Sequence, residues 1–164
     1  MELKLKNTNS PYKHLCLEHI LSYKCDDVID GFMKSFSVSN TESQEIFKEM
    51  LRWIWYCNSP QSVGYRSIDS SILIIDEMWH TFILYTKEYH NFCHEYLGYY
   101  LHHSPTKKSD AIEFKKQTRK EVLEIKKTQY ELVYDLLGKN VFINWYQTYP
   151  EKYSAKNILS MRIK

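Results

Sequence analysis

The sequence predicts an all-α protein, a single-domain bundle of six or seven helices with one long helix in its C-terminal half. At 164 residues the chain is long enough for a sizeable core, and its four Gly and four Pro are too few for a turn-rich β-sandwich. Large rings, namely 14 Tyr, 7 Phe and 4 Trp, are available to fill that core. The helical domain is expected to span residues 11–150, between a flexible N-terminus (1–10) and a C-terminal tail (151–164).

The N-terminal third is expected to contain three helices. Residues 11–24 form the first helix and residues 26–36 the second. Thr41 and Gln44 have the spacing of a capping box, in which the N-cap hydroxyl bonds the backbone N–H three residues later and that residue's side chain bonds back. A third helix is therefore expected from Thr41 to about Cys57, followed by a loop.

The middle of the chain is expected to contain a fourth and a fifth helix. Residues 72–75 are all Ile or Leu and would suit a short strand, but the apolar pattern continues at helical spacing and favours the first turn of a helix. Thr86 is expected to break this helix and to cap a fifth one over residues 87–97. Gly98 suits the left-handed position that commonly ends a helix.

The C-terminal part is expected to hold the long helix. A connector over residues 99–108 leads to a helix over residues 110–137, which Gly138 ends. A last short helix is expected over residues 141–149. Pro150 terminates it, because proline lacks the N–H that a helix interior needs.

Five of the seven histidines lie between His80 and His103, and this cluster is where chemistry is most expected. Imidazole is the commonest metal ligand and the side chain that titrates near neutral pH. Asp76 and His80 are four residues apart, so they share one face of a helix, and His90 and His94 have the same spacing. Pairs of this spacing commonly chelate one metal ion on a helix.

A second group of ligands follows the fifth helix. His102 and His103 lie just past the expected helix end, where the backbone can return toward His80. Asp76, His80 and His102 or His103 are therefore the predicted ligands of a divalent transition metal, zinc or iron, with no other cofactor expected. Glu77, next to this site in sequence, could serve as a general base, while no catalytic residue is otherwise assigned.

A structural interpretation of the same residues stays open. Asp76 and His80 would then form a hydrogen bond without any metal. His90 and His94 would be exposed to solvent, and Cys93 would be a buried residue of the core. The protein would then be a non-catalytic protein–protein interaction module, because aromatic residues are the usual anchors of interfaces. Its ring-rich surface would consist of Tyr96, Tyr99, Tyr100, Trp145 and Tyr146.

Charge and hydropathy restrict the partners. The net charge is +2, and the basic residues between Lys107 and Lys127 are interspersed with acidic ones and with a single aromatic residue, Phe114, which argues against nucleic-acid binding. The apolar runs are far too short for a membrane span, and no signal-peptide pattern begins the chain. A cytoplasmic protein is expected, with secretion without a signal left open.

A family resemblance is carried by Asp76, Trp79, His80, Tyr89, Cys93, Gly98 and the pair His102-His103 before Pro105. This pattern resembles the helical module of the glycine-rich domain-containing protein-like family, over residues 45–150. The chain lacks the glycine-rich tail and so resembles the short form. The family pattern does not require His90 and His94, so the resemblance implies a site at the other histidines with Asp76. It implies a fold and a candidate site but no reaction.

Overall fold

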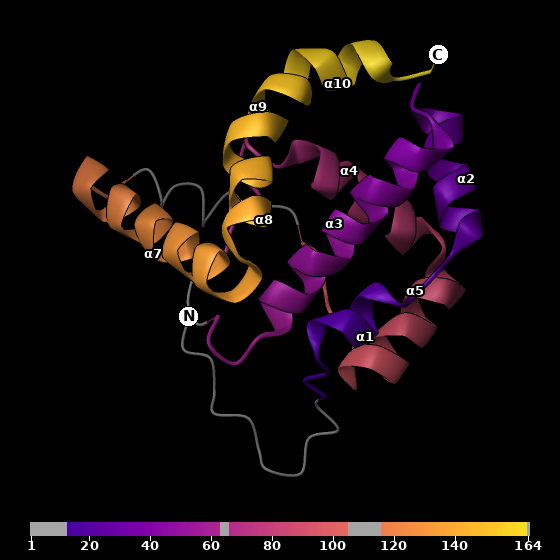
Figure 1. Cartoon of the computed structure of the whole chain (residues 1–164), viewed down its shortest axis with the longest axis horizontal. Helices are drawn as coiled ribbons and strands as arrows, with labels where there is room; N and C mark the ends of the chain where they lie inside the picture. Colours follow the sequence, from indigo (N-terminus) through magenta and orange to yellow (C-terminus); the bar gives the residue numbers. More distant parts are fainter. Residues whose placement is uncertain (1–12, 63–65, 105–115, 164) are drawn as a thin grey trace.

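The computed structural model describes residues 13–62, 66–104 and 116–163 and shows a bundle of helices (Figure 1). These described residues contain no β-strand, only an isolated antiparallel bridge between Phe36 and Arg162. The all-α prediction is therefore confirmed. In chain order, with η for π-helical segments, the elements are α1 (Leu17–Leu21), α2 (Asp26–Ser35), α3 (Asn40–Asn58), α4 (Leu73–Leu84), α5 (Thr86–Phe92), η1 (Cys93–Leu97), α7 (Arg119–Leu137), α8 (Lys139–Ile143), η2 (Asn144–Thr148), α9 (Tyr149–Lys152) and α10 (Ala155–Met161).

The first helix is much shorter than the residues 11–24 that the sequence predicts. The backbone before α1 makes tertiary hydrogen bonds instead of helical ones: the Lys13 N–H donates to the carbonyl of Leu97, and the carbonyl of Leu15 accepts from Trp55 Nε1. A backbone group that makes a tertiary hydrogen bond is not available for the bond that a helix would require of it. The predicted flexible N-terminus, residues 1–10, lies outside the described residues.

The third helix begins earlier than expected. Ser39, not Thr41, is the N-cap of α3, and its hydroxyl accepts from the backbone N–H of Glu42 at 3.1 Å. Serine with glutamate three residues later is also a capping pattern, but the Glu42 side chain is used elsewhere and accepts from Tyr153 Oη at 2.7 Å. The capping box predicted at Thr41 is therefore wrong by two residues, and Thr41 lies inside the first turn.

The fourth and fifth helices agree with the sequence in type and differ at their junction. Residues 72–75 lead into α4 and do not form a strand. The break is at Tyr85, whose φ and ψ of −82° and 66° are not helical, and Thr86 is the first residue of α5 with no capping role. Gly98 has φ +75° and ends the segment in the left-handed conformation, as predicted.

The long helix is α7, and it is capped inside the predicted span. Thr118 has an extended backbone, and with Glu121 it forms a complete capping box, so α7 begins at Arg119. The predicted start at residue 110 lies outside the described residues, but one unbroken helix from there to residue 137 is wrong because of this cap. Gly138, with φ +87°, ends α7 as predicted.

The C-terminal residues are helical where a tail was expected. Pro150 does not terminate a helix; it is the second residue of α9, which follows the π-helical segment η2 directly. Residues 151–164, predicted as a tail, include α10, whose Ile158 is buried. The Ser37 N–H donates to the carbonyl of Met161, which fixes the end of α10 to the segment after α2.

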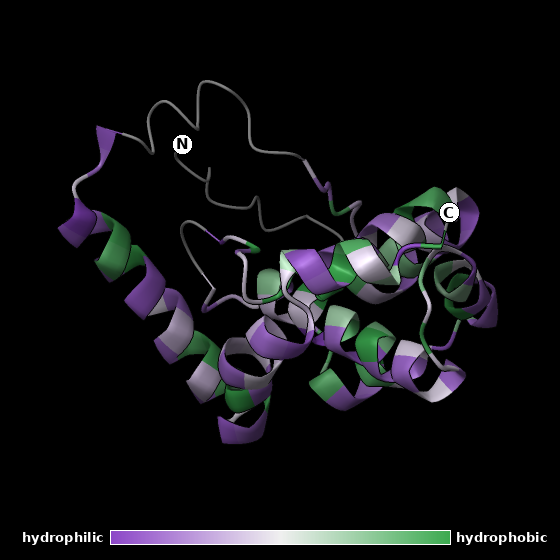
Figure 2. Ribbon diagram, turned by 90° about the horizontal axis from the view of Figure 1, so that it is seen from above, coloured by the Kyte–Doolittle hydropathy of each residue, from purple (hydrophilic) through white to green (hydrophobic). Residues whose placement is uncertain are grey.

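The core surrounds α3, which runs through the middle of the bundle and contacts α1, α2, α4 and α7 (Figure 1). Figure 2 shows hydrophobic and hydrophilic residues alternating along the helices, as expected where each helix turns one face inward. Trp53 and Trp145 meet edge-to-face in this core, and Trp145 Nε1 donates to Glu49 Oε2 at 2.7 Å. Burial raises the pKa of the Glu49 carboxyl.

Candidate metal centre

Asp76, His80 and His103 lie together at the surface of α4. Asp76 and His80 are one helical turn apart, and His103 reaches them from the segment after η1. Their potential ligand atoms all lie within 4.8 Å of one another, the one such group of three or more His, Cys, Asp or Glu side chains that the described part of the chain contains. The sequence spacing therefore predicts two members of the cluster, and the fold supplies the third.

The carboxylate of Asp76 is closer to His103 than to its helical neighbour. His103 Nε2 lies 2.9 Å from Asp76 Oδ1, a hydrogen bond in which the ring N–H donates to the carboxylate. His80 Nδ1 is 3.7 Å from Asp76 Oδ2, beyond hydrogen-bond distance. The structural Asp76–His80 bond expected from the sequence is therefore replaced by a bond to His103.

His103 is positioned by a second layer of aromatic residues. Its ring stacks on the indole of Trp79, with centroids 4.3 Å apart. Trp79 Nε1 donates to Tyr89 Oη, which in turn donates to the carbonyl of Leu101 at 2.6 Å. This chain of contacts fixes the backbone two residues before His103. The sequence pattern contains Trp79 and Tyr89 but gives no sign of this positioning role.

The two histidines differ in exposure and are stacked on each other. The His80 side chain is 54% exposed and that of His103 is 16% exposed. Their rings are parallel within 2°, with centroids 4.8 Å apart. Lone pairs of ring nitrogens lie in the ring plane, so stacked parallel rings do not aim at one common point. A shared ion therefore requires one ring to turn, and the exposed His80 has the room to do so.

The remaining predicted histidines lie outside the cluster. His102 is exposed, and its ring meets that of Tyr100 edge-on with centroids 4.8 Å apart. His90 and His94 are also exposed, on α5 and η1. Of His102 and His103, which the sequence left as alternatives, His103 is therefore the one that lies beside Asp76 and His80.

Glu77 and Cys93, two further residues singled out in the sequence, make structural contacts. The Glu77 carboxylate accepts from Arg162 Nη2 at 2.7 Å, so it ties α4 to the C-terminal segment. Its predicted role as a general base has no support in this geometry. Cys93 is buried, and burial raises the pKa of its thiol, which agrees with a packing role.

The ring-rich surface predicted for an interaction module is mostly not a surface. Trp145 is completely buried in the core. Tyr99 is partly buried and donates to Asn58 Oδ1, while Tyr96 and Tyr146 are also partly buried. Only Tyr100 among the five is exposed. These five rings therefore do not form the exposed docking surface that was predicted.

The predicted absence of a membrane span agrees with the described helices, none of which is long and apolar enough to cross a bilayer. The cytoplasmic location stays a prediction.

No curated protein and no solved structure matches the chain significantly, and the resemblance to the glycine-rich domain-containing protein-like family stays a prediction. A family model described as UCP032817-like matches residues 18–132, well over half of the chain, including α4 and the segment that carries His103. The chain therefore belongs to the UCP032817-like family.

Proposed function

We propose that this protein binds a divalent transition metal ion, zinc or iron(II), through Asp76, His80 and His103. The observation that carries the proposal is that one carboxylate and one imidazole of α4 lie with a second imidazole, from a segment more than 20 residues later, so that their ligand atoms are all within 4.8 Å of one another. Two histidines and one carboxylate are a donor set that suits both ions, and three protein ligands leave a coordination position open.

The distances fit an ion after small adjustments. Ligand atoms about 2.1 Å from a tetrahedral zinc ion lie roughly 3.4 Å apart. The separations of the two imidazoles from the Asp76 carboxylate, 2.9 Å from Oδ1 to His103 and 3.7 Å from Oδ2 to His80, lie on either side of that value. An ion would replace the proton that Asp76 and His103 share, and His80 would turn out of its stack to complete the set.

The residues around the three proposed ligands support a role in positioning them, and no reaction is assigned to the site. Trp79 and Tyr89 hold His103 in place, as outer residues commonly do around metal sites. A bound zinc ion would lower the pKa of a coordinated water molecule. Since Glu77 is paired with Arg162, no base beside that position is assigned, and the proposed function is metal binding.

The test is the metal content of untagged protein purified without chelator, measured by inductively coupled plasma mass spectrometry. We expect near-stoichiometric zinc or iron in the wild type and in His90→Ala, an exposed histidine outside the cluster. Asp76→Asn, His80→Ala and His103→Ala should each lose the metal, because two remaining ligands bind far more weakly than three.

Metal-free wild-type protein that stays metal-free after incubation with zinc or anaerobic iron(II) would contradict the proposal. Equal loss of metal in His90→Ala and in the cluster variants would show that the ion is bound elsewhere.

A further inference from the structure

The helix α7 presents an apolar stripe to the outside of the bundle. Gln129 and Val133 are its buried residues, both in its C-terminal half, and its N-terminal half projects away from the other helices (Figures 1 and 2). On another face Leu123 is 56% exposed and Tyr134 is 48% exposed. Such large apolar side chains on a solvent-facing helix mark a candidate binding surface.

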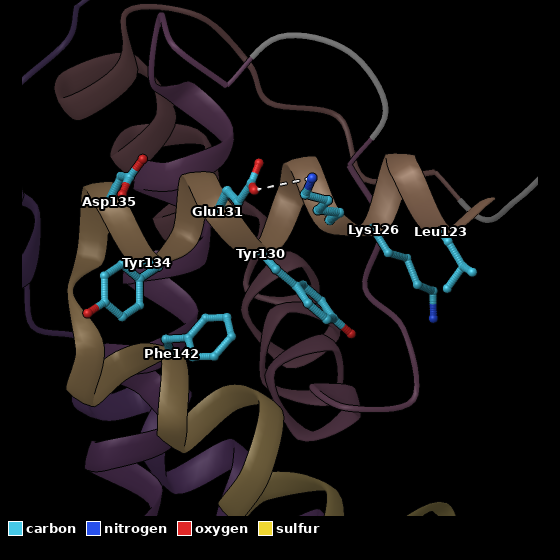
Figure 3. Close-up of a pocket in the computed structure, with 8 residues that line it drawn as sticks. Leu123, Lys126, Tyr130, Glu131, Tyr134, Asp135 and Phe142 are labelled. Carbon is cyan, nitrogen blue, oxygen red and sulfur yellow. Dashed lines mark ion pairs between the residues drawn. The ribbon is translucent and has the colours of Figure 1, made fainter. Parts of the chain in front are cut away.

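This surface is hollowed. A groove of about 780 Å³ runs along α7 and is bordered by Phe142 of α8. Figure 3 shows Leu123, Tyr130 and Tyr134 on one side of α7, with Phe142 facing them and Glu131 and Asp135 on the other edge. The rings of Tyr134 and Phe142 meet edge-to-face with centroids 5.8 Å apart and form an apolar part of the groove.

The exposed residues have the spacing of a helix-pairing seam. Leu123, Lys127, Tyr130 and Tyr134 follow one another at steps of four, three and four residues. This is the alternation of the two core positions in a coiled coil, and here it lies on a face that the described residues leave open. These four residues are called the α7 stripe below.

The charges on α7 are unevenly distributed along its length, although Lys127 pairs with Glu131 of the same helix at 3.9 Å and Lys126 pairs with Asp69 at 3.3 Å. Residues 119–127 carry four basic and two acidic side chains, a net charge of +2, and residues 128–137 carry Glu131 and Asp135 alone, a net charge of −2. The helix dipole favours the opposite order, with acids at the N-terminal end and bases at the C-terminal end. A partner with the reverse order would compensate both halves.

We propose that this partner is a second copy of the chain, with two α7 helices packed antiparallel about a twofold axis near Thr128 and Gln129. A twofold interface must be self-complementary, and the α7 stripe meets that condition. Leu123 of one copy faces Tyr134 of the other, and Lys127 faces Tyr130, a favourable cation–π geometry. The same alignment sets Lys127 beside Glu131, and Lys120 beside Asp135, of the second copy.

The proposed dimer is independent of the metal site, which lies on α4 and in the segment after η1. A single helix pair with a bordering ring is a small interface, so we expect a dissociation constant on the order of 10 μM. Sedimentation velocity of the full chain over roughly 1–500 μM should therefore show a monomer–dimer equilibrium. Wild-type protein that is monomeric over this whole range would overturn the proposal and leave the groove to a different partner.

A matched pair of variants locates the interface. Leu123→Asp puts a negative charge into the apolar contact, opposite Tyr134 and next to Asp135 of the second copy, and should weaken the dimer by about tenfold or more. Leu159→Asp on α10, where Leu159 is 69% exposed, makes the same change away from α7 and should leave the equilibrium unchanged. Both sites are exposed, so far-ultraviolet circular dichroism should show unaltered folding. Equal effects of the two variants, or none from Leu123→Asp, would overturn the proposal.

A charge-exchange experiment tests the antiparallel pairing. An acidic variant, K120E/K127E, and a basic variant, E131K/D135K, should each be monomeric, because every cross-pair then brings like charges together. Mixed in equal amounts they should form a heterodimer, since one α7 is then acidic along this edge and the other basic. Failure of the mixture to associate, or undiminished self-association of either variant, would contradict the pairing.

Discussion

At the scale of single residues, His80 and His103 have different roles although both belong to the cluster. His103 is bonded to Asp76 and stacked on Trp79, so it contributes to the fold with or without an ion. His80 is exposed and lies 3.7 Å from the same carboxylate, so it contributes little until an ion is bound. This difference separates a structural cluster from a metal site.

We therefore expect His103→Ala to lower the free energy of unfolding of metal-free protein by about 1–2 kcal/mol, and His80→Ala to change it by less than about 0.5 kcal/mol. Zinc at about 100 times its dissociation constant should add about 2.7 kcal/mol to the wild type and nothing to His80→Ala. Urea unfolding with and without zinc measures both effects. Equal stabilisation of wild type and His80→Ala would mean that His80 is not a ligand.

At the scale of elements, α7 shows how a local motif defines a helix end that tertiary contacts do not. Thr118 and Glu121 exchange hydrogen bonds, with Thr118 N–H donating to Glu121 Oε2 at 2.6 Å, and the helix turns after them carry no buried side chain. The backbone N–H and the hydroxyl of Thr118 both donate to the Glu121 carboxylate, and these bonds lower its pKa. The start of α7 is thus held by its cap.

Thr118→Ala should for this reason act locally. We expect loss of about 1 kcal/mol of protection in the first turns of α7, because the capped N–H groups lose their acceptor. Backbone amides near the buried Val133 should be unaffected, since that half of the helix is packed. Hydrogen exchange followed residue by residue measures this, and a uniform loss of protection along the helix would contradict it.

The elements also show how far local sequence can be trusted. Gly98 and Gly138 were assigned correctly as helix ends because a positive φ is a property of the residue itself. The cap at Thr41 was misplaced because two capping patterns overlap, Ser39 with Glu42 and Thr41 with Gln44, and local spacing alone does not choose between them. The short α1 has a tertiary cause, since the backbone before it bonds to Leu97.

At the scale of the whole molecule, the C-terminal helices close the bundle through a few polar contacts. Glu42 at the start of α3 accepts from Tyr153 and pairs with Lys152 at 2.9 Å, and Glu77 of α4 pairs with Arg162. Partial burial raises the pKa of Glu42, but the bonds from Tyr153 and Lys152 outweigh it, so the net pKa is lowered.

A lowered pKa fixes the sign of the pH dependence. The stabilisation by Glu42 is fully present above the pKa of glutamate in the unfolded chain and is lost as the pH falls through the lower folded value. Glu42→Gln should therefore cost about 1 kcal/mol at pH 7 and little at pH 3, measured by urea unfolding. Glu45→Gln, at an exposed position of the same helix, is the control and should change neither value. An equal loss at both pH values would contradict the ionic role.

The sequence by itself determined the all-α class, most helix positions and the pairing of Asp76 with His80 on one face, because helical periodicity and glycine conformation act over a few residues. The tertiary structure alone decided that His103 completes the cluster while His102, His90 and His94 stay outside it. That outcome depends on the break at Tyr85 and on the Tyr89 bond to Leu101, which bring together residues 27 positions apart. Contacts over such separations follow from how helices pack, and no local pattern encodes them.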